Sequence, residues 1–159
     1  MAKFRIENVV ASTSLGHELD LKAISLALGG SEYEPEQFPG LIYRIKEPKT
    51  AIAMVAKQIE AAGIPITKNP EIEVQNIVAT SDLGAQLDLN AIAVTLGPGS
   101  VEYEPEQFPG LVYRIDEPKV VLLMFGSGKV VCTGARKPAD VERAVEKITA
   151  ELKASGLLR

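Results

Sequence analysis

The chain has 159 residues, of which 46% are hydrophobic and 24% are charged, a composition typical of a soluble globular protein. Its length suits one compact domain, or two small halves that share a core. No apolar run approaches the roughly 18–20 residues of a membrane-spanning helix, and the first residues lack the apolar core of a signal peptide. The single cysteine, Cys132, excludes an internal disulfide. We therefore expect a cytoplasmic protein without a membrane partner.

The net charge of −4 and the pI near 5.1 argue weakly against nucleic acid as a partner. Phosphate groups are usually neutralised by a basic surface. Net charge averages over all faces, however, so an acidic outer face can coexist with a basic or apolar binding face. The overall charge therefore leaves a nucleic-acid-binding function open.

A strand and a short helix are the first elements that the sequence predicts. Residues 4–11 mix β-branched and polar side chains, as strands do. Asp20 is suited to cap a helix over residues 21–28, and Gly29 is suited to end it. The pattern then predicts a short strand over residues 32–34, a turn over 38–40, a strand over 41–45 and a helix over about 52–62.

The same order of elements recurs with an addition near the C-terminus. Residues 72–79 predict a strand, and Asp88 is suited to cap a helix over residues 89–96 that ends at Gly97. Further on, the β-rich runs 120–125 and 129–133 flank residues 126–128 and predict a hairpin. A long amphipathic helix follows from Pro138 and Asp140 to about Ser155, and its apolar face consists of Val141, Ala144, Val145, Ile148 and Leu152.

Long blocks of sequence occur twice, which indicates a duplication. Residues 32–41 recur unchanged as residues 102–111, and the Asn-Val-Val-Ala of residues 8–11 corresponds to residues 76–79. These blocks divide the chain into a first copy, residues 1–66, and a second copy, residues 67–159.

The first copy lacks a stretch that the second copy contains. Pro48 corresponds to Pro118, whereas Ala61 corresponds to Ala154, so about 23 residues have no counterpart after Ala51. In the second copy this stretch contains the hairpin and the start of the long helix. Its absence predicts unpaired strand edges and an interrupted core in the first copy.

The repeated blocks resemble the core of the TATA-box-binding proteins. The hallmark of that family is a direct repeat with an Asn-Val/Ile-Val strand, a Glu-Tyr-x-Pro-Glu-x-Phe-Pro-Gly-Leu block, a Tyr-Arg strand and a Phe-x-Ser-Gly-Lys hairpin that ends in Thr-Gly-Ala. Residues 72–159 contain all of these blocks, and residues 4–66 contain all but the hairpin. The resemblance implies an α+β fold, a two-repeat saddle with a curved antiparallel sheet and helices on the convex face.

For function, the resemblance implies a transcription initiation factor that binds a TATA-box promoter element in the minor groove and bends it. Its partners would be A·T-rich promoter DNA, transcription factor B and the RNA polymerase machinery. The short N-terminal extension resembles archaeal members, which implies association with the nucleoid of an archaeal cell. Neither a cofactor nor a metal is implied.

The DNA-binding positions of the family correspond to residues in both copies. Apolar wedges that enter a base step correspond to Phe38, Phe108 and Phe125, and donors suited to the acceptors of A·T pairs correspond to Asn8, Asn76 and Thr133. Apolar groove contacts correspond to Val10, Val78, Leu123 and Val131, and phosphate contacts to Arg44, Arg114, Ser127 and Lys129. Without the resemblance, each Phe or Val would be taken as a core residue and each Arg or Lys as a solvated surface charge.

The sequence does not support an enzyme. Residues 126–129, Gly-Ser-Gly-Lys, lack the first glycine and the final Ser or Thr of a phosphate-binding loop. His17 and Cys132 lie far apart without ligand or nucleophile partners, and the glutamates between residues 32 and 36 lack an acid–base partner. Two functions stay open. One is promoter binding, and the other is a degenerate family member that acts as a protein-interaction or decoy module without bending DNA, which the missing stretch favours.

Overall fold

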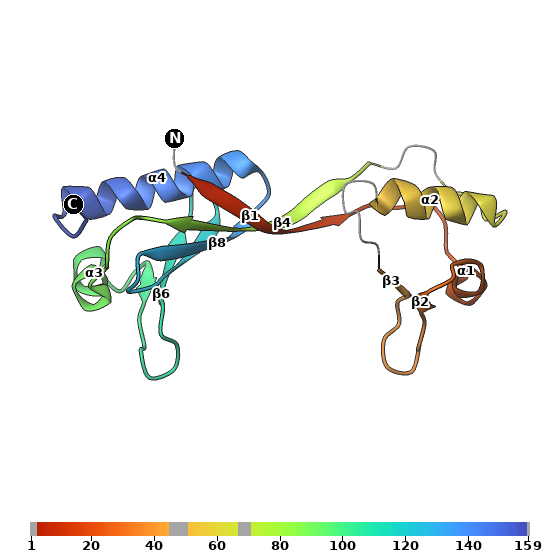
Figure 1. The fold of residues 1–159 in the computed structure, drawn as a ribbon, viewed down its shortest axis with the longest axis horizontal. Helices are drawn as coiled ribbons and strands as arrows, with labels where there is room; N and C mark the ends of the chain where they lie inside the picture. The colour runs from red at the N-terminus through yellow and green to blue at the C-terminus, as the bar shows by residue number, and fades with distance from the viewer. Residues whose placement is uncertain (1–2, 45–50, 67–70, 159) are drawn as a thin grey trace. The chain divides into compact units, whose positions relative to one another are not determined.

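The computed structural model describes residues 3–44, 51–66 and 71–158, and the chain forms two compact units. The larger unit consists of Met1–Ser12 and Glu73–Arg159, and the smaller unit consists of Thr13–Ile72. An antiparallel sheet and two helices make up the larger unit (Figure 1). Most of the residues predicted to bind DNA belong to this larger unit.

The sheet of the larger unit has six strands. Their order in space is β1 (Phe4–Ser12), β4 (Glu73–Asp82), β8 (Lys129–Ala135), β7 (Val120–Met124), β6 (Leu111–Ile115) and β5 (Val101–Glu102). Every neighbouring pair is antiparallel. Strands β7 and β8 form the predicted hairpin, and the chain returns so that β8 also pairs with β4, with Cys132 opposite Ala79.

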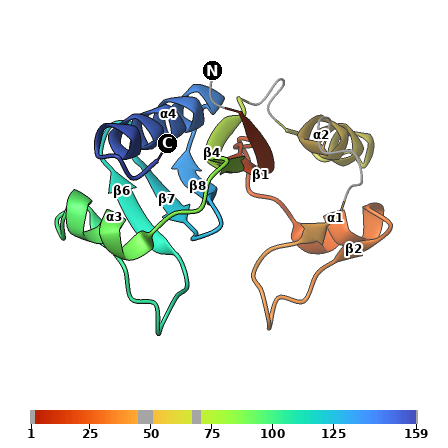
Figure 2. The same cartoon turned by 60° about the vertical axis from the view of Figure 1, so that its left-hand side comes forward.

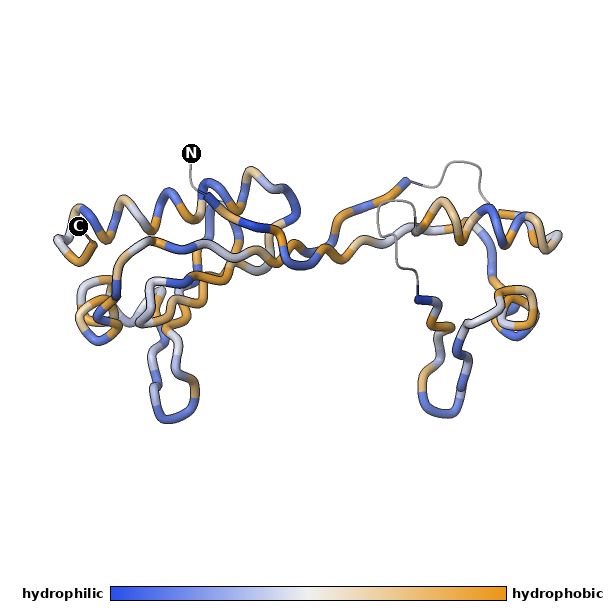
Figure 3. Tube along the Cα trace, viewed as in Figure 1, coloured by the Kyte–Doolittle hydropathy of each residue, from blue (hydrophilic) through white to orange (hydrophobic). Residues whose placement is uncertain are grey.

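Helix α4 (Pro138–Ala154) lies along one face of this sheet, and α3 (Leu89–Leu96) packs at the β5 end (Figures 1 and 2). Polar and apolar residues alternate along α4 (Figure 3), and its five predicted core residues are all buried. They pack against strand residues that point to the same side, namely Ile77, Ala79, Leu111, Tyr113, Ile115, Leu122, Met124, Val130 and Cys132. Each large apolar side chain buried here contributes about 1.5–3 kcal/mol to folding.

The predicted capping residues determine where both helices begin. Asp88 Oδ1 accepts a hydrogen bond from the N–H of Ala91 (3.0 Å), and α3 ends at Gly97. Pro138 is the first residue of α4, where Asp140 Oδ2 accepts a hydrogen bond from the N–H of Lys137 (3.2 Å). The sequence-based predictions for both helices are confirmed.

Strand β1 comes from the first copy of the repeat but belongs to the sheet of the larger unit. It pairs antiparallel with β4, its counterpart in the second copy. Asn8 lies opposite Val78, and Val10 lies opposite Asn76, so corresponding residues exchange places across the pair. The compact units therefore do not follow the repeat, whose boundaries at residues 66 and 67 stay a prediction from sequence.

The smaller unit contains α1 (Leu21–Ala27), β2 (Ser31–Glu32), β3 (Ile42–Tyr43) and α2 (Ala51–Ala61). As predicted, Asp20 caps α1, accepting a hydrogen bond from the N–H of Ala23 at 3.0 Å. The two short strands pair with each other, and Ile24, Leu28 and Ile59 form the buried core. This core is much smaller than that of the larger unit, as expected for a copy that lacks the hairpin.

Some predicted boundaries in the first copy were wrong. The strand predicted over residues 32–34 ends at Glu32, because the N–H groups of Gln37 and Phe38 both bond to the carbonyl oxygen of Glu34 and turn the chain there (3.0 and 2.9 Å). Helix α1 is capped by Leu28 rather than ended by Gly29. Of the strand predicted over residues 41–45, β3 is observed, and Ile45 lies outside the described residues. The α+β class with an antiparallel sheet is confirmed.

Candidate nucleic-acid interface

The six-stranded sheet has a face that α4 does not cover. Because successive side chains of a strand point to opposite faces, the residues between the core positions point away from α4. We call this surface the open face; it carries Asn76, Val78 and Thr80 on β4, Val131 and Thr133 on β8, Val121 and Leu123 on β7, and Val112 and Arg114 on β6. Six of the predicted site residues are thus brought together on one surface.

Asn76 is held in a defined orientation on the open face. Its Oδ1 accepts a hydrogen bond from the N–H of Gly134 (2.7 Å), which fixes the amide nitrogen on the other side. That nitrogen, Nδ2, lies 3.5 Å from Oγ1 of Thr133. An amide nitrogen carries two hydrogens, so Nδ2 keeps donor capacity for a ligand above the sheet.

Two phenylalanine rings meet at one end of the open face. Phe125 follows β7, and its ring centroid lies 5.9 Å from that of Phe108 in an edge-to-face arrangement. Gly110 makes this close approach possible, because a Cβ there would lie 2.7 Å from the ring of Phe108 and 3.0 Å from that of Phe125. In the smaller unit, Phe38 packs in the same way over Gly40 and is 53% exposed.

Three of the four predicted phosphate contacts carry solvent-accessible charges, and the fourth, Ser127, is an exposed neutral residue. Arg114 forms an ion pair with Glu102 at 3.3 Å. The corresponding residues of the first copy, Arg44 and Glu32, also form an ion pair. Exposed pairs of this kind contribute only about 0–1 kcal/mol, so both guanidinium groups can exchange a carboxylate for a phosphate. Lys129 is exposed and, within the described residues, makes no ion pair.

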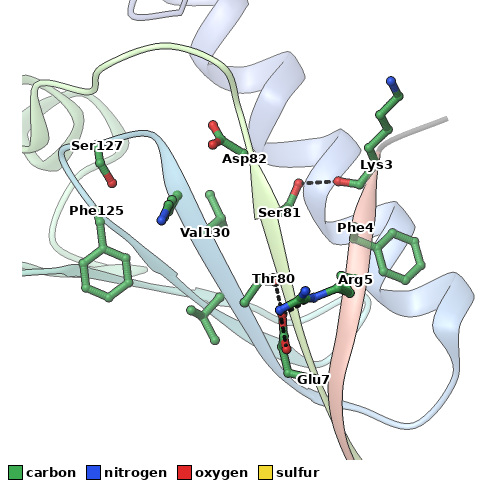
Figure 4. Close-up of a pocket in the computed structure, with 12 residues that line it drawn as sticks. Lys3, Phe4, Arg5, Glu7, Thr80, Ser81, Asp82, Phe125, Ser127 and Val130 are labelled. Carbon is green, nitrogen blue, oxygen red and sulfur yellow. Dashed lines mark hydrogen bonds and ion pairs between the residues drawn. The ribbon is translucent and has the colours of Figure 1, made fainter.

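A hollow of about 820 Å³ lies where β1, β4 and the β7–β8 hairpin adjoin (Figure 4). It is lined by Lys3, Phe4, Arg5, Glu7, Thr80, Ser81, Asp82, Phe125, Ser127, Lys129, Val130 and Val131. Three of these residues are cationic and two are carboxylates. This part of the surface is therefore not acidic, although the chain as a whole has a net charge of −4.

Glu7 is neutralised inside this hollow. Arg5 donates two hydrogen bonds to its carboxylate, at 2.8 and 3.0 Å, and the hydroxyl of Thr80 donates a third at 2.6 Å. The Arg5 and Thr80 hydrogen bonds hold the pKa of Glu7 below its usual range, and Glu7 in turn raises the pKa of Arg5. The carboxylate therefore stays ionised, and its charge is balanced by that of Arg5.

Two of the remaining predicted residues extend the open face onto β1, because directly paired residues of an antiparallel sheet point to the same side. Asn8 and Val10 are exposed on β1, opposite Val78 and Asn76. Ser127 lies in the β7–β8 turn. Phe38 and Arg44 belong to the smaller unit.

Thr80, Val121 and Val112 also lie on the open face but were not predicted from the sequence. Thr80 lies two positions beyond Val78 on β4, and Val121 lies two positions before Leu123 on β7. The period of two along each strand would have identified both. The hydrogen bond between Thr80 and Glu7 joins residues far apart in the sequence, and no local pattern signals it.

Comparisons with known proteins identify the family of the chain. A sequence model of the family described as "Transcription factor TFIID (or TATA-binding protein, TBP)" matches residues 3–56 and 71–155. This chain belongs to the TATA-box-binding protein family. Since that family consists of transcription factors, the expectation that the chain is not an enzyme is confirmed.

Two curated relatives and one solved structure, all from archaea, show how similar the chain is to members of the family. The TATA-box-binding protein of Thermoplasma acidophilum is 55% identical over 179 aligned positions, covering 98% of this chain and 97% of that protein. TATA-box-binding protein E of Halobacterium salinarum is 50% identical, covering 96% and 95%. The solved structure of Methanococcus jannaschii TBP is 44% identical, with a TM-score of 0.86 over 96% of this chain and 99% of that one. The 179 aligned positions exceed the 159 residues of this chain, so the first alignment places gaps in it.

The described residues offer neither a metal site nor a reactive thiol. Among the described residues, no group of three or more His, Cys, Asp or Glu side chains could hold a metal ion. Cys132 is buried, and burial raises the pKa of its thiol to about 11, so it is not a reactive nucleophile. No helix in the described segments is long and apolar enough to cross a membrane.

Proposed function

We propose that this protein binds A·T-rich promoter DNA with its open face, bends the DNA, and presents it to transcription factor B and RNA polymerase. The observation that carries the proposal is the period-two arrangement on β4, β7 and β8. It gathers an oriented amide, a hydroxyl and several half-buried aliphatic side chains on one uncovered surface. The membership in the TATA-box-binding protein family supports it.

The chemistry of this surface suits the minor groove of A·T pairs. That groove presents only acceptors at A·T pairs, and G·C pairs add the amino group of guanine. Asn76 and Thr133 supply donors for the acceptors, whereas Val78, Leu123 and Val131 would lie against sugars and base edges. An aliphatic surface leaves the amino group of guanine without a partner, and an unsatisfied buried donor costs about 1–3 kcal/mol. The surface therefore favours A·T pairs.

Bending is assigned to the aromatic pair. Insertion of an apolar side chain unstacks a base step at a cost of a few kcal/mol, and the additional protein surface that the bent DNA contacts offsets this cost. Phe108 and Phe125 are placed to act together, because Gly110 lets their rings meet. Arg114 and Lys129 would hold the phosphates beside the widened groove.

The alternative function is a protein-interaction module that binds no promoter, and the missing stretch of the first copy favours it. Fluorescence anisotropy with an A·T-rich octamer and a G·C-rich control, each with and without transcription factor B, separates the two functions. Promoter binding predicts at least about 100-fold tighter binding to the A·T-rich duplex than to the G·C-rich one. It also predicts that energy transfer between dyes at the two ends of the A·T-rich duplex rises on binding, because a bend brings the ends closer. Equal binding to both duplexes would exclude the promoter function, and binding of transcription factor B without DNA would establish the alternative.

A further inference from the structure

The two copies differ in the aromatic residues at the positions that correspond to the wedges of the family. In the second copy, Phe108 and Phe125 meet edge to face. In the first copy, Phe38 occupies the position of Phe108, but the position that corresponds to Phe125 falls in the missing stretch. The fourth phenylalanine of the chain, Phe4, packs against the main core and cannot replace it. One copy thus has a pair of rings and the other has a single ring.

The amides of Asn76 and Asn8, which occupy corresponding positions, also differ: in the part of the chain that the structure describes, only the amide of the second copy is held by neighbouring groups. Asn76 is oriented by Gly134 and lies beside the hydroxyl of Thr133. Asn8 makes no side-chain hydrogen bond to any described residue. The positions that correspond to Thr133 and Gly134 also fall in the missing stretch, so the two groups beside the amide of Asn76 have no counterpart in the first copy.

The apolar strands that flank the amide differ as well. In the second copy, β7 and β8 add Leu123 and Val131 to the open face beside Asn76. The counterparts of both residues are absent from the first copy, because the missing stretch includes the hairpin. The wedge pair, the oriented amide and the aliphatic groove contacts are therefore all complete in the second copy only.

We propose that this chain reads half of an A·T-rich element: the second copy selects A·T pairs and opens one base step, and the first copy adds little discrimination. This inference rests on the proposed function and specifies how much of the DNA determines binding. An amide that is already oriented loses less freedom on binding than a mobile one. Two rings in contact bury more surface in an opened base step than a single ring does. Selectivity and unstacking are thus concentrated at one end of the element.

Half-replaced duplexes test this inference. Three DNA duplexes are compared by anisotropy with the full chain: an A·T-rich octamer, the same octamer with one half replaced by G·C pairs, and a fully G·C-rich octamer. We expect the half-replaced duplex to bind within about threefold of the A·T-rich octamer. A reader that needs both halves would lose about 30-fold or more, because each mismatched pair typically costs about tenfold.

Base unstacking provides the second measurement. With 2-aminopurine at the outer step of the A·T half, its fluorescence should rise on binding, since unstacking relieves quenching. Phe125→Ala should abolish the rise and weaken binding at least about tenfold, whereas the matched Phe38→Ala should change both by less than about twofold. If Phe125→Ala fails to fold, Phe125→Leu, which keeps an apolar side chain, takes its place and should lose most of the rise.

The outcomes separate this inference from the proposed function. If the A·T-rich octamer binds tightly but the half-replaced duplex binds no better than the G·C-rich one, both copies read DNA and the inference is wrong while the proposed function stands. The inference would also be wrong if Phe38→Ala and Phe125→Ala lost binding affinity and the fluorescence rise to the same extent. If all three duplexes bind alike, the proposed function itself fails.

Discussion

Val9 on β1 pairs with Ile77 on β4, and the two residues occupy the same position in the two copies of the repeat. On either side of this pair, corresponding residues exchange places, so the pair marks a local two-fold axis between β1 and β4. The burial of the two residues differs greatly: Ile77 is 2% exposed, and Val9 is 48% exposed. Strand β8 and the main core enclose Ile77, whereas the counterpart of β8 belongs to the stretch that the first copy lacks.

This difference predicts unequal effects of the same truncation. Ile77→Ala should lower the free energy of unfolding by about 2–5 kcal/mol, because it leaves a cavity in the main core. Val9→Ala, at the corresponding but exposed position, should cost less than about 1 kcal/mol. Urea unfolding followed by circular dichroism measures both variants. Equal losses would mean that Val9 is as buried as its counterpart.

A glycine in the β7–β8 turn is predicted to be irreplaceable. Gly128 has a φ of +88°, and a Cβ at this position would overlap the backbone carbonyl of Ala85. Gly128→Ala should therefore destabilise the larger unit by at least about 1–3 kcal/mol. Gly99→Ala is the matched control, because its Cβ would meet no atom within 4 Å and its φ is not positive. A thermal melt of both variants suffices, and a normal melting temperature for Gly128→Ala would contradict the observed turn.

Tyr113 is predicted to make stability fall at alkaline pH. Its hydroxyl donates a hydrogen bond to Glu151 Oε2 at 2.8 Å, and burial together with that carboxylate raises the pKa of Tyr113 to about 12. Because the folded pKa exceeds the ordinary value near 10, the stabilisation is complete below about pH 10 and is lost as the pH rises through 12. Tyr113→Phe should be about 1–2 kcal/mol less stable at pH 8. The difference in free energy of unfolding between this variant and the unchanged protein, measured by urea unfolding, should disappear by pH 12. A difference that persists at pH 12 would refute the role given to the hydrogen bond between Tyr113 and Glu151.

The sequence predicted the elements better than it predicted their association. Asp20 and Asp88 could be recognised as helix caps because a cap and its N–H partner lie three residues apart. The pairing of β1 with β4 was not predicted, because it joins residues about 70 positions apart, and nothing local determines the register. The early end of β2 at Glu32 was missed because two main-chain hydrogen bonds to Glu34 prevailed over the strand propensity of Tyr33.

In the candidate site, too, the residues could be predicted but their long-range contacts could not. Asn76, Val78, Leu123 and Val131 were predicted by resemblance, and the alternation along the strands places them on one face. The pairing of Glu7 with Arg5 and Thr80 could not be predicted, since Thr80 reaches Glu7 only through the β1–β4 register. That pairing balances the charge of one of the two carboxylates that line the hollow beside the open face.

Lys129 is predicted to contribute through a phosphate contact alone. Lys129→Ala should weaken binding to A·T-rich and G·C-rich DNA by a similar factor and should lower the slope of log affinity against log salt by about 0.9. Lys153→Ala, at the far end of α4, is the matched control and should leave the slope unchanged. Titrations at several salt concentrations measure the slope. A loss confined to A·T-rich DNA would show that Lys129 contacts bases instead.

A charge placed on the open face tests the central claim most directly. Val131→Glu would put a carboxylate among the residues proposed to enter the minor groove, where like-charge repulsion costs several kcal/mol; we expect at least about 100-fold weaker binding to the A·T-rich octamer. Val94→Glu makes the same change on α3, where Val94 is 84% exposed and outside the open face. It should bind within about twofold of the unchanged protein, because it alters net charge equally without entering the groove. Equal affinities for the two variants, with both folded by circular dichroism, would contradict the assignment of the open face as the DNA-binding surface.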